Sequence, residues 1–94
     1  MKTGIELIAA ERERQITKEG WTPEHDDEHD EEEMVSAAVA YAWDNQDMWP
    51  WEDEAWKPSK DKVRNLAKAG ALIAAEIDRI SRMNVIGQAR RDQD

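Results

Sequence analysis

The sequence predicts an all-α protein, a small three-helix bundle with a long Trp-rich loop. In three stretches the apolar residues recur three and four positions apart, as in helices that bury one face, and no stretch alternates like a half-buried strand. With 94 residues, 39% of them hydrophobic, the chain is expected to form one helical domain over residues 1–83 and a flexible polar tail over residues 84–94. A core this small often depends on self-association, so we expect an oligomer.

The first helix is expected over residues 4–18. Thr3 and Glu6 have the spacing of a capping box, in which each side chain bonds the backbone amide of the other residue. Gly20 is suited to the position that stops a helix. The face expected to be buried contains Ile5, Ile8, Ala9, Arg12 and Ile16.

A short helical turn is expected over residues 23–29, because Thr22 and Pro23 combine a capping residue with a proline at the first helical position. The second long helix is expected over residues 31–44, where Asp30 opens another capping-box spacing. Its predicted buried stripe contains Met34, Ala37, Ala38, Tyr41 and Ala42.

Residues 44–58 are expected to form a loop, because prolines and acidic residues interrupt any apolar period. Loops of this length are often functional. The third helix is expected over residues 60–83, capped by Ser59. Gly70 in its middle costs about 1 kcal/mol relative to alanine, which indicates close contact with another helix. The predicted buried stripe contains Val63, Leu66, Ala67, Gly70, Ile73, Ala74, Ile77 and Ile80. Self-association is expected through an Ala/Gly/Ile surface of this helix.

The composition excludes several classes of protein. The chain has no cysteine, hence no disulfide and no thiolate metal site, which favours a cytoplasmic location. Its N-terminus lacks a signal-peptide pattern. No segment approaches the roughly 20 apolar residues of a membrane span. The formal charge of −9 argues against binding to duplex DNA.

Residues 19–30 contain both histidines of the chain and are the first candidate for a functional site. His25 and His29 would share a face if the segment is helical, and Asp26 lies beside them. Imidazole and carboxylate suit zinc, manganese or iron, so a weak site formed by His25, His29 and Asp26 is one interpretation. An acidic, solvated helix start is the other, and we expect no tightly bound structural metal and no cofactor.

The second candidate is a ligand pocket built from tryptophans and a few polar side chains. Aromatic stacking and an arginine fork are common means of holding a base and its phosphates. Here tryptophan would stack on the base, Arg12 would meet phosphate, Asp26 would accept ribose hydroxyls, and Lys68 would add positive charge. The predicted ligand-binding residues are Arg12, Gln15, Trp21, His25, Asp26, Trp49, Trp51 and Lys68. Packing over the core is the alternative for aromatic rings, and it is preferred for Tyr41 and Trp43.

The third candidate is a magnesium site, because the chain resembles all-α, MazG-like nucleotide pyrophosphohydrolases in size, helicity and acidity. Glu28 and residues 31–33 would supply the ExxE pattern of one helix in those enzymes. On the later helix, Glu76 and Asp78 are only two positions apart and do not share a helical face. An enzyme of this class therefore stays an alternative.

Four motifs resemble a family of small bacteriophage and prophage proteins. They are ERxRQ at residues 11–15, EGWTxxHDDxH at 19–29, WPW at 49–51 and KAGALIxAEI at 68–77. Phage accessory proteins of this size include oligomeric proteins that sequester nucleotide-derived immune signals, such as ADP-ribose-type or cyclic nucleotides. The resemblance therefore implies a counter-defence protein of the host cytoplasm that binds such a signal. An acidic inhibitor of a host nucleic-acid-binding factor, with residues 26–33 as its contact strip, is a further alternative.

Overall fold

The computed structural model describes the backbone of residues 1–29 and 32–91 and the side chains as far as Met83. Its elements are α1 (Gly4–Lys18), α2 (Pro23–Asp26), α3 (Glu33–Trp43), the 3-10 turns η1 (Gln46–Met48) and η2 (Asp53–Ala55), and α4 (Lys62–Arg91). The all-α prediction is confirmed, with three main helices, one short helix and a cluster of tryptophans. No helix in the described part of the chain is long and apolar enough to span a membrane.

The ends of α1 and the start of α2 follow the predicted capping chemistry, whereas α2 ends at Asp26 rather than at the predicted residue 29. The Glu6 amide donates to Thr3 Oγ1 over 3.2 Å, and the Thr3 amide donates to Glu6 Oε1 over 2.9 Å. Gly20, two residues after α1, has a φ of +74°, a conformation that favours glycine. The α2 N-terminus is capped by Thr22, whose hydroxyl accepts a hydrogen bond from the His25 amide.

The ends of α3 and α4 depart from the predicted bounds. The expected cap Asp30 lies outside the described residues, and α3 begins at Glu33. Asp61 rather than Ser59 accepts from the first turn of α4, through a 2.9 Å bond from the Val63 amide. Helix α4 continues to Arg91, eight residues beyond the predicted end at residue 83 (91 − 83).

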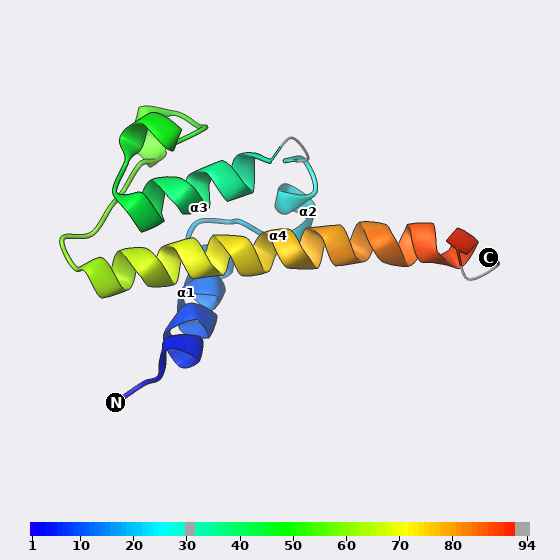
Figure 1. Cartoon of the computed structure of the whole chain (residues 1–94), viewed down its shortest axis with the longest axis horizontal. Coiled ribbons are helices and arrows are strands. Elements are labelled where there is room, and N and C mark those ends of the chain that lie inside the picture. Colours follow the sequence, from blue (N-terminus) through cyan, green and yellow to red (C-terminus); the bar gives the residue numbers. More distant parts are fainter. Residues whose placement is uncertain (30–31, 92–94) are drawn as a thin grey trace.

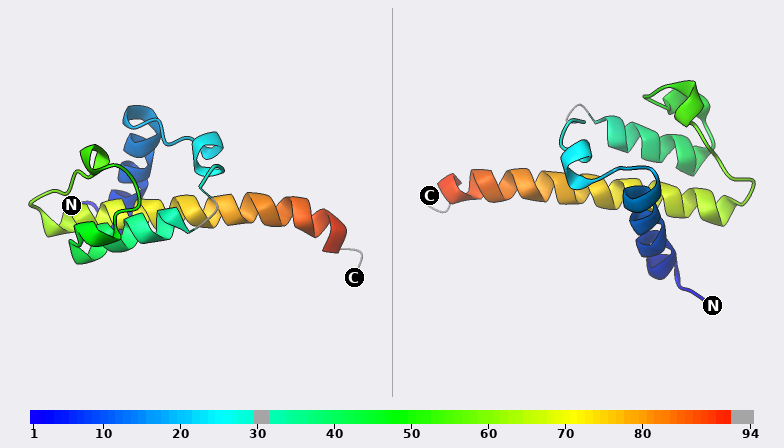
Figure 2. Two further views of the ribbon diagram at one scale, coloured as in Figure 1. Left: turned by 90° about the horizontal axis from the view of Figure 1, so that it is seen from above. Right: turned by 180° about the vertical axis from the view of Figure 1, so that it is seen from behind.

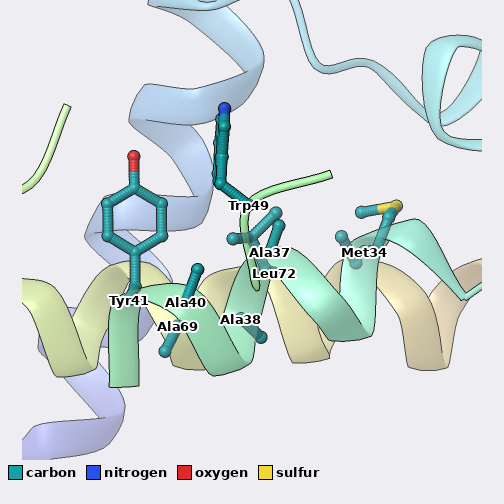
Figure 3. Packing of buried hydrophobic residues seen from close by; sticks show 9 residues of the cluster. Met34, Ala37, Ala38, Ala40, Tyr41, Trp49, Ala69 and Leu72 are labelled. Atoms are coloured by element: carbon teal, nitrogen blue, oxygen red, sulfur yellow. The ribbon is translucent and has the colours of Figure 1, made fainter. Parts of the chain in front are cut away.

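Helix α4 is the centre of the fold, as Figure 1 shows. Helix α3 lies along its N-terminal half, α1 crosses it from the opposite side, and its C-terminal part extends past the other helices (Figures 1 and 2). The main apolar cluster forms between α3, α4 and the loop that follows α3 (Figure 3). Its buried members are Met34, Ala37, Ala38, Ala40, Tyr41, Trp49, Ala69, Leu72 and Ala75. The predicted stripe of α3 is confirmed, with Ala42 only partly buried.

The buried face of α1 differs from the predicted one. Glu11 and Gln15 are buried, whereas Ile5 is 81% exposed. The reason is the crossing geometry, because α1 reaches α4 where Gly70 leaves room for Ile8. A Cβ atom at Gly70 would lie 2.6 Å from Ile8 Cδ1, so the expected close helix contact at this glycine is confirmed.

The predicted stripe of α4 is divided between two environments. Ala67 is buried and Gly70 is partly buried against α1. The prediction is wrong for the large members, which are exposed: Val63, Leu66, Ile73, Ile77 and Ile80. Helix α3 packs instead against the neighbouring α4 face that contains Leu72. The core role preferred for Trp43 is also wrong, since this ring is 74% exposed at the end of α3.

Candidate functional site

A cavity of about 640 Å³ opens between the α2 segment and the loop after α3. Its lining residues are Trp21, His25, His29, Pro50, Trp51, Glu52 and Ala55. The volume lies within the range of about 300–1,000 Å³ that is typical of small-molecule sites. Two segments that are separate in the sequence, and that both carry predicted site residues, therefore form one pocket.

Aromatic rings make up the walls of this cavity. Trp21 and His25 are nearly parallel, with 8° between their planes and 6.4 Å between their centroids. Trp51 closes the other side, with centroid distances of 5.8 Å to Trp21 and 5.0 Å to His29. Trp51 Nε1 is buried and has no hydrogen-bond partner among the described residues.

A buried ion pair supports the α2 side of the pocket. Asp26 is fully buried, and its Oδ2 accepts a 2.7 Å hydrogen bond from Arg12 Nη2. Arg12 Nη1 donates to the Trp21 carbonyl over 3.2 Å. The guanidinium thus fixes α2 and the Trp21 backbone to α1. Arg12 and Asp26, expected to contact phosphate and ribose, lie behind the wall and are occupied with each other.

The two histidines converge in the cavity wall. Their Nε2 atoms are 3.4 Å apart. His29 Nδ1 lies 2.8 Å from Glu33 Oε2, and His25 Nδ1 lies 3.4 Å from Asp26 Oδ1. Each imidazole therefore has a carboxylate at one nitrogen and the other imidazole at the second.

Three further residues predicted to bind a ligand do not line the cavity. Gln15 is buried between α1 and α4, where its Nε2 donates to the Lys68 carbonyl. Trp49 is buried in the aromatic cluster, and its Nε1 donates to the Glu52 carbonyl over 2.9 Å. Lys68 Nζ donates to the Lys57 carbonyl over 2.7 Å, and burial lowers the pKa of this ammonium group. Because Lys68 is bound on the Tyr41 side of the core, it brings no charge to the pocket.

The acidic side chains are dispersed rather than gathered. Among the described residues, no group of three or more histidine, cysteine, aspartate or glutamate side chains is arranged to hold a metal ion. Glu76 pairs with Arg79 through a 2.6 Å contact, and Asp27 pairs with Arg82 over 2.6 Å. Glu31, part of the ExxE pattern considered above, lies outside the described residues. The described carboxylates therefore give the hydrolase alternative no metal cluster.

Sequence reasoning did not assign Pro50, Glu52 or Ala55 to the pocket, and it considered His29 only as a metal ligand. The Trp-Pro-Trp motif could have indicated Pro50, which lies between two residues already predicted as ligand contacts.

Comparison with protein-family models, with curated proteins and with solved structures found no match to this chain.

Proposed function

We propose that this protein binds a planar, nucleotide-derived ligand in the aromatic cavity and holds it unchanged, as a phage counter-defence protein that sequesters a nucleotide immune signal. The observation that carries the proposal is the cavity itself, with tryptophan rings and two imidazoles facing one space of nucleotide size. Stacking of a base on aromatic side chains contributes about 1–3 kcal/mol per base. The biological setting is proposed from the resemblance of four sequence motifs to small phage proteins.

The geometry suggests a role for each wall residue. Trp21 and Trp51, whose rings both line the cavity, would stack on the base. His25 and His29 would face the phosphates, since among the described residues no lysine or arginine lines the cavity. Glu52 would accept hydrogen bonds from ribose hydroxyls. This assignment replaces Arg12 and Asp26, which are bound to each other.

Self-association is the second part of the proposal, with another copy of this chain as the partner. The exposed apolar residues of α4 follow one another at spacings of three, four or seven positions, which is the spacing of a helix–helix seam. Their stripe continues into an apolar crevice of about 180 Å³ that is lined by residues of both α1 and α4, including Leu7 and Leu66. In a two-fold interface the exposed isoleucines of one copy could insert into the crevice of the other copy, and the reverse.

The test of binding uses ADP-ribose as the probe. The protein is incubated with ADP-ribose, freed of unbound probe and heated, and the released material is analysed by chromatography. Intact ADP-ribose supports sequestration, cleaved product supports the hydrolase alternative, and no retained probe rejects this ligand class. Trp51→Leu should abolish retention, whereas Trp43→Leu is the matched control, because Trp43 is exposed outside the cavity. Circular dichroism of each variant verifies that it remains folded.

The salt dependence of binding distinguishes the alternative of an acidic, protein-binding inhibitor from ligand binding in the cavity. Affinity through residues 26–33 should fall steeply with ionic strength, whereas stacking in the cavity should respond less. Much of that strip is already engaged, since Asp26, Asp27 and Glu33 pair with Arg12, Arg82 and His29. The pocket is therefore the better supported binding surface.

A further inference from the structure

The histidine pair in the cavity wall has the geometry of a metal chelate. The Nε2 atoms of His25 and His29 are 3.4 Å apart, whereas the ring centroids are 4.7 Å apart. The two rings therefore turn these nitrogens toward each other. Both side chains also line the cavity and remain accessible, with exposed fractions of 35% and 19%.

The carboxylates beside the two Nδ1 atoms favour one neutral tautomer of each ring. His29 Nδ1 lies 2.8 Å from a Glu33 carboxylate oxygen, and His25 Nδ1 lies 3.4 Å from an Asp26 oxygen. An ionised carboxylate only accepts hydrogen bonds, so each favours the neutral tautomer with hydrogen on Nδ1. Each Nε2 then presents a lone pair to the other. Two lone pairs in contact repel unless a proton or a metal cation lies between them.

A zinc-class ion fits this spacing. Zinc–nitrogen bonds are about 2.0–2.1 Å long, so two nitrogens on one edge of a tetrahedral site are about 3.3–3.4 Å apart. The observed separation of the His25 and His29 Nε2 atoms is 3.4 Å. We infer that His25 and His29 chelate one zinc-class divalent cation through Nε2, with its remaining coordination positions open to the cavity.

The neighbouring carboxylates act on the ligands rather than on the metal. Asp26 is fully buried and already accepts from Arg12, so it orients His25 and is not the third ligand that its position in the sequence suggested. Glu33 orients His29 in the same way. Carboxylates that hold a ligating imidazole in this manner typically change metal affinity by about 10–100-fold.

A cation at this place would bring positive charge into a pocket whose lining, in the part of the chain that the structure describes, contains Glu52 but no lysine or arginine. Its open positions would accept an oxygen donor from an anionic ligand. The metal site itself rests only on the arrangement of His25, His29 and their carboxylates, and it does not depend on the proposed nucleotide. It is therefore tested with the metal alone.

The experiment is calorimetric titration of the tag-free protein with Zn²⁺, with excess Mg²⁺ present to occupy sites that consist of carboxylates only. We expect one Zn²⁺ per chain. His29→Gln should reduce binding to the background level, and Glu33→Gln should weaken it about tenfold. Glu24→Gln, which changes an exposed carboxylate of α2, is the matched control and should leave the affinity unchanged. Co²⁺ in place of Zn²⁺ should give the intense visible bands of a tetrahedral site.

Two results would overturn the inference. One is a wild-type protein that binds no more Zn²⁺ than His29→Gln. The other is a Zn²⁺ affinity that Glu24→Gln lowers as much as Glu33→Gln does, since that result assigns the metal to surface carboxylates. If circular dichroism shows that His29→Gln is unfolded, His25→Gln replaces it, because the His25 side chain is the more exposed of the two.

Discussion

Replacing Gly70 with alanine should test the α1–α4 crossing on which the pocket is built. The added Cβ would lie 2.6 Å from Ile8 Cδ1 and 2.8 Å from Ile8 Cγ1. Carbon atoms pack best at about 3.5–4.0 Å, so Ile8 or the whole of α1 must move. Overpacking of this kind costs about 1–3 kcal/mol. Alanine regains about 1 kcal/mol of helix propensity. We therefore expect Gly70→Ala to lower the free energy of unfolding by about 1 kcal/mol.

Gly70→Ala should raise the free energy of unfolding, rather than lower it, when the Ile8 side chain is shortened. In an Ile8→Ala background the three nearest atoms, all from the Ile8 side chain, are gone, and only the propensity gain of about 1 kcal/mol remains. Urea unfolding followed by circular dichroism, at one fixed protein concentration, gives each value. Gly4→Ala is the matched control, because a Cβ at Gly4 has nothing within 4 Å. A Gly70→Ala effect that is the same in the wild-type and Ile8→Ala backgrounds would contradict the observed contact between Gly70 and Ile8.

Three further perturbations have defined outcomes. Asp26→Asn should lower the free energy of unfolding by about 2 kcal/mol, because it leaves the partly buried Arg12 charge without its partner. The exposed control Asp27→Asn should cost less than about 1 kcal/mol, and urea unfolding measures both values. Ultraviolet titration of Tyr41, the single tyrosine, should give a midpoint above pH 10.0, since burial raises its pKa. The stability that is linked to this group is present below pH 10.0 and is lost as the pH rises through the raised pKa of the folded state. Ile77→Glu should convert the self-associated protein to a 10.9 kDa monomer in analytical ultracentrifugation, and a wild type that is already monomeric at high concentration would contradict the assembly proposal.

Local chemistry explains which parts of the fold were predictable from the sequence. The ends of α1 and the start of α2 depend on residues three or four positions apart, such as Thr3 with Glu6, and these predictions are confirmed. The α4 stripe is a different case, because periodicity shows that a face is apolar but not which neighbour covers it. Gly70 admits α1 beside the stripe, and Ile77 stays exposed.

The candidate site was likewise predictable only in part. The sequence predicted Trp21, His25 and Trp51 as residues of one pocket, and all three line the cavity. It also placed Arg12 and Asp26 there as free groups, although they are bound to each other over 2.7 Å. Fourteen positions separate these two residues, so neither helical periodicity nor motif spacing indicates the contact. Only the tertiary fold shows which charges remain available to a ligand.

The most direct test of the central claim is to observe the tryptophan indole N–H signals during ligand binding. The chain has five tryptophans, so a nitrogen–proton correlation spectrum resolves five such signals. Titration with ADP-ribose should shift the Trp21 and Trp51 signals together, with saturation, while Trp43, which is 74% exposed and outside the cavity, stays in place. An unchanged spectrum at millimolar ADP-ribose, or a shift of Trp43 without Trp51, would contradict nucleotide binding in this pocket.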